Sequence, residues 1–217
     1  MTPDEIRDTL RFYFITDDAV KGFPAIDQVR VALDAGATLI QYRNKSFTLD
    51  CFEEVEAIGR LCREYRVPFV INDHVLLARA VGADGIHVGQ DDAPPRLARR
   101  ILGPRAIVGV SISSMMELEH TDLAFCDYIG TGPTFPTDTK ADAKAVHGLA
   151  GLRDIVNRSP LPAVAIGGID PGNVSDCFAY GAAGVAVISC ITRSADPQGA
   201  AAAMASACGV DAPGGWS

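Results

Sequence analysis

The sequence predicts an α/β protein whose single domain is a (β/α)8 barrel of the TIM type. Eight short β-rich runs recur along the 217 residues, and their starts lie about 25 residues apart. Most of these runs are continuously apolar, which is typical of parallel strands that are buried on both faces. Helical patterns separate the runs, as alternating strands and helices require. The expected strands are residues 11–16, 37–43, 68–73, 85–90, 107–111, 128–132, 163–168 and 184–189.

The strongest helical pattern between these runs spans residues 50–66. Apolar side chains step along one face of it by four and three positions, so we expect that face to lie in the core. The face consists of Cys51, Val55, Ile58, Cys62 and Tyr65. Asp50 and Glu53 form a capping pair that predicts the start of this helix.

Three further helices are expected to end at a glycine in the left-handed conformation, namely Gly36, Gly82 and Gly181. Their similarity indicates a repeated β-α unit. An open doubly wound sheet is the alternative fold. It would more naturally stop at five or six strands and carry a G-x-G-x-x-G turn after the first strand, and residues 11–18 contain no such turn.

Composition favours a globular domain over a disordered or membrane-spanning chain. The sequence has 48% hydrophobic residues and a formal charge of -8, and this charge argues against nucleic acid as a partner. The N-terminus lacks the apolar run of a secretory signal, and the longest apolar stretch, residues 181–191, is too short to cross a membrane. We therefore expect a cytoplasmic protein with no membrane partner, in which all six cysteines are buried free thiols.

The same reasoning gives the domain organisation. Residues 1–208 are expected to form the catalytic barrel, and residues 209–217, which are rich in Gly and Pro and include Trp216, a flexible tail. A homo-oligomer is compatible with the sequence, which does not determine the oligomeric state.

Acidic and basic residues follow three neighbouring strands, at the barrel end that carries the chemistry in this fold. Arg43 and Lys45 follow the second strand, Asp73 ends the third, and Asp91 and Asp92 follow the fourth. Carboxylates hold Mg²⁺ together with water and substrate oxygens, and Mg²⁺ with Arg and Lys holds a diphosphate. The alternative is a surface salt-bridge cluster, and the spacing does not choose between Asp91 and Asp92.

A second anion site is expected at the last two strands. The glycine segment 166–171 lets backbone N–H groups approach a ligand, and Ser189 offers a hydroxyl beside it, at the usual phosphate position of barrels. The alternative is a glycine turn that only reverses the chain. The loop after the sixth strand adds Thr137, Thr139 and Lys140, and we expect residues 134–140 to form a mobile lid.

The histidines are less informative. His87 lies inside the fourth expected strand and is interpreted as a satisfied core group, while His74, His120 and His147 share no metal-ligand spacing. No G-x-S-x-G, H-E-x-x-H or P-loop pattern occurs, which argues against hydrolases and nucleotide kinases. Cys190, beside Ser189, is expected to pack behind the site.

Several segments together resemble the thiamine-phosphate synthase family, from about residue 12 to residue 191. They are QYRNK (41–45), INDHVLLARAVGADGIHVGQDD (71–92), GVSISS (109–114), GPTFPTDTKADA (132–143), IGGI (166–169) and VIS (187–189). The resemblance implies a transferase that joins hydroxymethylpyrimidine diphosphate to a thiazole phosphate, releasing diphosphate and forming thiamine phosphate.

The resemblance also implies roles for individual residues. The pyrimidine diphosphate would contact Gln41, Arg43, Lys45, Asn72, Ser111 and Lys140. The thiazole phosphate would contact Thr137, Thr139, Gly168, Ile188 and Ser189. Mg²⁺ would be bound by Asp73 and Asp92, so that the resemblance chooses Asp92 over Asp91. The catalytic groups would be Arg43, Lys45, Lys140 and Ser111, in a Mg²⁺-assisted dissociative substitution.

Three other functions compete with this interpretation. A thiazole tautomerase of similar fold has no diphosphate to bind and would not be expected to keep QYRNK, the Asn-Asp pair and FPTDTK together. A non-catalytic phosphate-binding regulator would be expected to carry an extra module. A sugar-phosphate isomerase or aldolase would need a strand-end lysine or carboxylate base away from the diphosphate cluster.

Overall fold

The protein is a closed barrel of eight parallel strands in the order β1 to β8. The computed structural model describes residues 2–139 and 146–212. The strands are β1 (Phe12–Ile15), β2 (Leu39–Tyr42), β3 (Phe69–Asn72), β4 (Gly85–Val88), β5 (Ile107–Ser111), β6 (Tyr128–Thr131), β7 (Ala163–Ile166) and β8 (Gly184–Val187). The barrel closes because β1 pairs with both β2 and β8. This confirms the predicted TIM barrel and rules out the open sheet.

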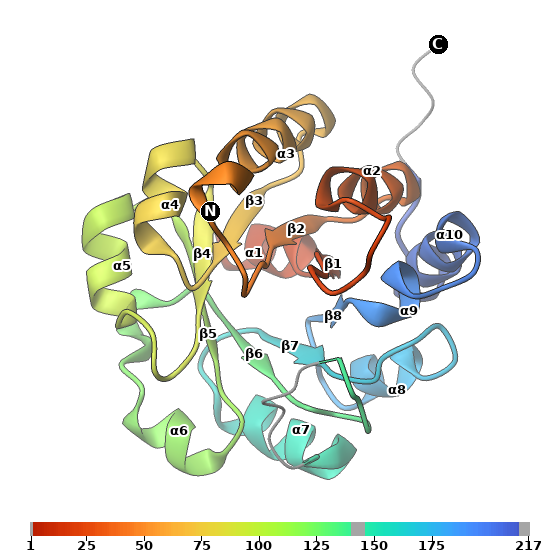
Figure 1. Cartoon of the computed structure of the whole chain (residues 1–217). Helices are drawn as coiled ribbons and strands as arrows, with labels where there is room; N and C mark the ends of the chain where they lie inside the picture. Colours follow the sequence, from red (N-terminus) through yellow and green to blue (C-terminus); the bar gives the residue numbers. More distant parts are fainter. Residues whose placement is uncertain (1, 140–145, 213–217) are drawn as a thin grey trace.

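The described helices form an outer ring around the strands, except α1, which lies behind the strands in the middle of the view (Figure 1). They are α1 (Pro3–Thr9), α2 (Ala25–Ala35), α3 (Phe52–Tyr65), α4 (Val75–Val81), α5 (Pro95–Leu102), α6 (Met115–His120), α7 (Gly148–Arg158), α8 (Val174–Ala179), α9 (Ser189–Thr192) and α10 (Pro197–Cys208). Two 3₁₀ turns, η1 (Leu49–Cys51) and η2 (Leu123–Phe125), lie between them. Among the described residues, no helix is long and apolar enough to cross a membrane.

All eight predicted strands are confirmed, each inside its expected run. Most observed strands are shorter than these runs, because the polar and glycine residues at the ends belong to the turns. The predicted glycine turns are also confirmed: Gly36, Gly82 and Gly181 have φ angles of 101°, 63° and 93°. These values lie in the left-handed region that glycine adopts without steric cost.

The start of α3 differs from its prediction. The prediction that Asp50 and Glu53 cap this helix is wrong. Asp50 is part of the 3₁₀ turn η1, and the helix begins at Phe52 with no side-chain cap. Cys51 precedes the helix and is half-buried, and so is Tyr65 at its other end. The middle of the predicted face, Val55, Ile58 and Cys62, is buried as expected.

The barrel interior is filled with side chains at one end and open at the other. A buried cluster contains Tyr13, Leu39, Val70, Ile107, Tyr128, Val164 and Ala186, one from each of seven strands. Ile6 and Leu10 belong to the same cluster, so that α1, which directly precedes β1, closes the N-terminal end. The C-terminal ends of the strands are therefore left for the site.

All six cysteines are free, as predicted, but the expectation that all are buried is wrong for two of them. Cys51 and Cys190 are half-buried, because one stands ahead of α3 and the other lies in the short helix α9. Cys190 packs against the main core cluster. Burial raises the pKa of the Cys62, Cys126 and Cys177 thiols to about 12.

The thiols of Cys62, Cys126 and Cys177 are expected to be unreactive in the folded protein. A pKa near 12 leaves almost no thiolate at pH 8, and the thiolate is the reacting form. Brief treatment of native protein with a water-soluble thiol reagent should therefore label Cys51 first, while the whole set of six reacts after unfolding in denaturant. Peptide mass mapping checks the order, and rapid labelling of Cys62 or Cys177 in native protein would contradict it.

Candidate active site

A pocket of about 290 Å³ opens at the C-terminal ends of the barrel strands. In this fold, that end is where catalytic residues from several strands meet. Eleven of the predicted site residues line the pocket: Arg43, Lys45, Asn72, Asp73, Asp92, Ser111, Thr137, Thr139, Gly168, Ile188 and Ser189. Asp91 lines it as well, and so do Gln90, Ser113 and Pro133.

Two predicted residues stand apart from this set. Lys140 lies outside the described residues, as does Trp216 of the predicted tail. Gln41 is described, but it does not line the pocket: it is buried in the barrel, where its side-chain amide donates a hydrogen bond to the Tyr13 hydroxyl. Of the predicted lid, residues 134–139 are described.

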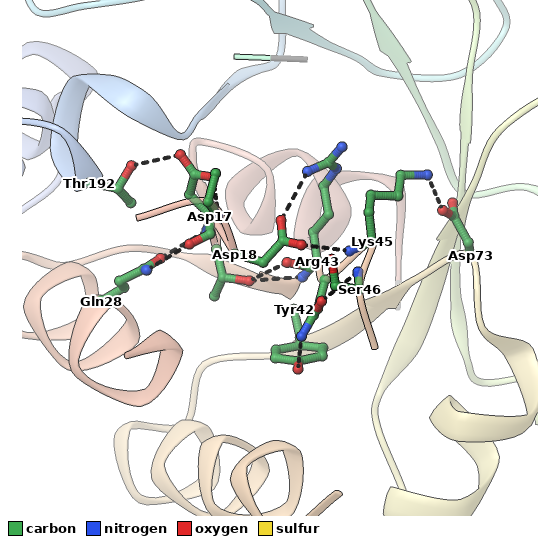
Figure 2. A network of polar contacts seen from close by, with 12 residues as sticks. Asp17, Asp18, Gln28, Tyr42, Arg43, Lys45, Ser46, Asp73 and Thr192 are labelled. Atoms are coloured by element: carbon green, nitrogen blue, oxygen red, sulfur yellow. Dashed lines mark hydrogen bonds and ion pairs between the residues drawn. The ribbon is translucent and has the colours of Figure 1, made fainter. Parts of the chain in front are cut away.

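The segment that follows β1 holds the turn that carries the two cations (Figure 2). The Thr16 hydroxyl accepts a hydrogen bond from the Arg43 backbone N–H at 2.8 Å and donates one to the Arg43 carbonyl at 3.0 Å. The Asp18 carboxylate accepts the Lys45 backbone N–H at 3.0 Å and lies 3.8 Å from the Arg43 guanidinium. The direction of both cationic side chains is therefore set by β1 as well as by β2.

Asp17 ties the same segment to α9, on the far side of the β1–β8 junction. Its carboxylate is buried, lies 3.1 Å from the Arg193 Nε and accepts a hydrogen bond from Thr192 at 3.4 Å. The Gln28 side chain binds both the N–H and the carbonyl of Asp17. The sequence reasoning did not single out Asp17 or Asp18. The available signal was their position directly after a predicted strand.

Two carboxylates, Asp73 and Asp92, face each other on the side of the pocket formed by the turns after β3 and β4. Burial, a hydrogen bond with Asp73 and the charge of Asp73 raise the pKa of Asp92, although the Gly89 N–H donates to it at 2.7 Å and lowers it. Asp73 is also paired with the Lys45 ammonium at 2.7 Å. The described residues contain no group of three metal-ligating side chains, so this pair could supply only part of a metal's ligands.

The other side of the pocket is built from the turns after β6, β7 and β8. Gly167 and Gly168 have φ angles of 97° and 63°, and a Cβ on Gly168 would lie 2.5 Å from the Pro136 carbonyl oxygen. Only glycine lets these loops approach so closely. The Thr139 and Ser189 hydroxyls are 2.8 Å apart, which joins the loop after β6 to the start of α9. We call residues 132–139, the described part of this connection next to β6, the β6 loop.

The β6 loop is also anchored by charge. Asp138 lies 3.7 Å from the same Arg193 guanidinium that pairs with the buried Asp17. The Asp138 side chain is 95% exposed, so water screens this pair and we assign it little stabilisation. The Thr139–Ser189 hydroxyl contact is therefore the main interaction that holds the described part of the loop against the pocket wall.

Similarity to known proteins shows the family to which the chain belongs. A family model described as thiamine monophosphate synthase matches residues 12–191, which include every pocket residue. The chain belongs to this family. The match confirms the predicted resemblance and the expected activity, that of a thiamine-phosphate synthase, a transferase that releases diphosphate.

Curated relatives in the thiamine monophosphate synthase family cover nearly the same length. The chain is 43% identical to a thiamine-phosphate synthase of Geobacillus thermodenitrificans, over 95% of this chain and 96% of that protein. It is 41% identical to one of Pyrococcus horikoshii, over 88% of this chain and 90% of that protein.

One solved structure agrees with the family assignment, and a more distant one shares the fold. A thiamine phosphate pyrophosphorylase from Pyrococcus furiosus superposes with a TM-score of 0.84 at 37% identity, covering 94% of this chain and 98% of that one. An orotidine 5'-phosphate decarboxylase from Pyrococcus horikoshii shares the barrel at 17% identity, with a TM-score of 0.65, covering 90% of this chain and 98% of that one. The second likeness shows the fold alone.

Proposed function

We propose that this pocket joins hydroxymethylpyrimidine diphosphate to a thiazole phosphate and releases diphosphate, with Mg²⁺ bound beside the diphosphate. One observation carries the proposal: a single pocket has cations and paired carboxylates from β2 to β4 and a glycine and hydroxyl wall from β7 and β8. Each wall of the pocket suits one phosphorylated substrate.

We also assign the enzyme to the cytoplasm, because its free thiols suit a reducing compartment.

We assign the diphosphate to the first wall. Arg43 offers a planar fork of donors for phosphate oxygens, and Lys45 a mobile ammonium. Asn72 and Ser111, at the ends of β3 and β5, supply neutral donors on the same side. By family resemblance Lys140 belongs to this group, and so does Gln41, although its side chain lies in the barrel interior beside Tyr13 and does not line the pocket. Both assignments rest on the resemblance alone.

The paired carboxylates fit a Mg²⁺ site. Asp73 and Asp92 stand close enough for one to raise the pKa of the other, a repulsion that a divalent cation between them would remove. Mg²⁺ takes few protein carboxylates and completes its shell with water and phosphate oxygens, which agrees with a pair instead of a cage. When bound, Mg²⁺ would neutralise negative charge on the diphosphate.

We assign the thiazole phosphate to the second wall. Backbone N–H groups around Gly168 and the hydroxyl of Ser189 can donate to phosphate oxygens, since no Cβ stands in front of the glycines. Thr137 and Thr139 add hydroxyls from the β6 loop, and Ile188 contributes an apolar contact.

The reaction then needs little proton transfer by the protein. The bond between the pyrimidine methylene carbon and the diphosphate oxygen breaks, and its electron pair leaves with the diphosphate. The thiazole nitrogen donates its lone pair to the methylene carbon and becomes positively charged. Arg43 and Lys45 stabilise the charge that develops on the leaving group. The β6 loop keeps water away from the electron-poor carbon.

We propose that the bond to the diphosphate breaks before the thiazole nitrogen attacks. In this order, the rate of the chemical step depends on substituents of the pyrimidine ring. An electron-withdrawing substituent on the ring destabilises positive charge at the methylene carbon. Single-turnover kinetics with such an analogue should therefore show a much slower chemical step than with the natural substrate. An unchanged rate would argue against the dissociative order while leaving the overall reaction intact.

The overall reaction is tested with purified protein and both substrates. Thiamine phosphate and diphosphate should appear in equal amounts when Mg²⁺ is present, and their formation should stop when EDTA removes the metal and resume when Mg²⁺ is restored. Omitting either substrate is the control. Absence of product under all conditions would overturn the proposed function, and EDTA-resistant turnover would overturn the metal assignment.

A further inference from the structure

A line of polar side chains crosses the barrel interior beneath the pocket, and its two tyrosines, Tyr13 and Tyr128, belong to a cluster of buried apolar residues. It joins Gln41 of β2, Tyr13 of β1, Tyr128 of β6, His87 of β4 and Ser111 of β5, and both tyrosines are essentially fully buried. The substrate contacts assigned above use only Gln41 and Ser111, at its two ends. The middle of the line therefore has no assigned role.

Each member of the line is hydrogen-bonded to the next. The Gln41 amide nitrogen donates to the Tyr13 hydroxyl, and the Tyr13 and Tyr128 hydroxyl oxygens are 2.9 Å apart. The Tyr128 oxygen is 3.0 Å from His87 Nδ1, and His87 Nε2 is 2.9 Å from the Ser111 Oγ. His87 is thus a hydrogen-bonded group, as predicted from the sequence, but it is linked to a pocket residue.

Two strand glycines make room for the line. A Cβ on Gly109 of β5 would lie 2.1 Å from the Tyr128 ring carbon Cζ, inside the ring's own space. A Cβ on Gly130 of β6 would lie 3.0 Å from the Cε1 of His87, closer than nearly all real contacts. Glycine weakens a strand because it has no side chain to pack, so these positions indicate a space that is kept for the two rings.

The direction of the hydrogen bonds follows from the first donor. The Tyr13 oxygen accepts the Gln41 amide hydrogen, and among its hydrogen-bond partners in the described residues the Tyr128 oxygen is the acceptor left for the Tyr13 hydrogen. Tyr128 then donates to His87 Nδ1, which must be unprotonated, and the ring hydrogen is on Nε2 and donates to Ser111. Burial raises the pKa of both tyrosines above its ordinary value, so each hydroxyl keeps the single hydrogen that this order needs.

This order of hydrogen bonds sets the direction of the Ser111 hydroxyl hydrogen at the pocket. Because the Ser111 oxygen accepts from His87, the Ser111 hydrogen is free to point away from His87 and toward the pocket that Ser111 lines. An anion needs donors, and a serine whose hydrogen pointed back at the histidine would instead present lone pairs to the diphosphate.

We propose that His87 is a positioning residue: the chain from Gln41 through Tyr13 and Tyr128 fixes its Nε2–H tautomer, which in turn aims the Ser111 hydroxyl hydrogen at the diphosphate. The inference rests on the proposed function for the identity of the anion. The tautomer itself is a property of the free protein and can be measured without substrate.

The first test is the tautomer. Protein labelled with ¹⁵N histidine distinguishes a ring nitrogen that carries a hydrogen from one that does not, and loss of signals in His87→Gln assigns His87 among the four histidines. At pH 8 in substrate-free protein we expect a neutral ring with its hydrogen on Nε2. A hydrogen on Nδ1 would mean that the chain runs in the opposite direction, which overturns the proposal.

The second test removes the link to His87. Tyr128→Phe should lower kcat about 10- to 100-fold, the size of effect found when outer hydrogen-bond partners of a site are removed. The KM for the thiazole phosphate should stay unchanged, and the Nε2–H tautomer should lose its preference. Tyr65→Phe is the matched control, because its lost hydroxyl donates to Asp34 on the outer helices α2 and α3.

A third variant separates positioning from packing. His87→Gln keeps an N–H donor within reach of Ser111 and should retain more activity than the apolar His87→Leu. If the wild-type protein forms no thiamine phosphate, the proposed function fails. The ¹⁵N measurement of the His87 tautomer still shows whether the hydrogen-bond chain runs in the proposed direction. If the wild type is active and Tyr128→Phe keeps its full kcat, the inference about His87 is overturned.

Discussion

Replacing Arg43 by alanine is expected to lower kcat for thiamine phosphate formation by about 10²- to 10³-fold, the loss found when one donor to developing charge is removed. Arg43 is only 8% exposed and lines the pocket, and the Thr16 hydroxyl and the Asp18 carboxylate fix its turn. A charge held away from water interacts strongly with an anion because little solvent screens it. The loss should appear in kcat, since the negative charge on the diphosphate is greater in the transition state than in the bound substrate.

Two comparisons make this prediction specific. Arg60→Ala removes the same charge from the exposed side of α3 and should leave kcat unchanged. Lys45→Ala should cost less than Arg43→Ala, because the Lys45 side chain is 52% exposed and water weakens its field. Steady-state kinetics with both substrates, together with the Tm of each variant, measures these effects. Near-normal kcat in Arg43→Ala with an unchanged Tm would place the diphosphate elsewhere.

The sequence was informative wherever one residue type had one physical use. Buried parallel strands must be apolar on both faces, so all eight runs could be recognised from composition alone. Glycines before a strand had to take the left-handed conformation, and Gly36 and Gly82 do. Polar residues at strand ends converge in any barrel, which is why Asp73 and Ser111 could be expected to line the same pocket.

The sequence was uninformative where a side chain depends on a partner far away in the chain. Tyr13 and Tyr128 are 115 residues apart and meet inside the barrel, and no local pattern pairs them. Gly109 lies inside the expected strand 107–111, but no neighbouring residue in the sequence indicates that it leaves space for a ring from another strand. The failed cap at Asp50 has a local cause: a 3₁₀ turn competes with the helix for the same residues, and short-range propensity does not choose between them.

The largest effect on stability is expected at Gly184, where β8 meets β1. A Cβ at this position would lie 1.7 Å from the Leu10 carbonyl oxygen and 2.4 Å from its carbon, so the backbone of the α1–β1 junction would have to move. Gly184→Ala should therefore lower the free energy of unfolding by about 3 kcal/mol or more. In a protein of this size, that corresponds to a fall in Tm of about 6–12 °C.

Gly59→Ala tests the same change where space exists. Gly59 lies within α3, and its Cβ would stand 3.5 Å from the Phe69 ring, an ordinary contact. Alanine is a better helix former by about 0.5–1 kcal/mol, so this variant should be more stable than the wild type. Opposite shifts of Tm in scanning calorimetry are expected for the two variants. A Gly184→Ala protein as stable as the wild type would mean that β1 and β8 can separate without loss, which a closed barrel does not allow, because each strand there is held by both neighbours.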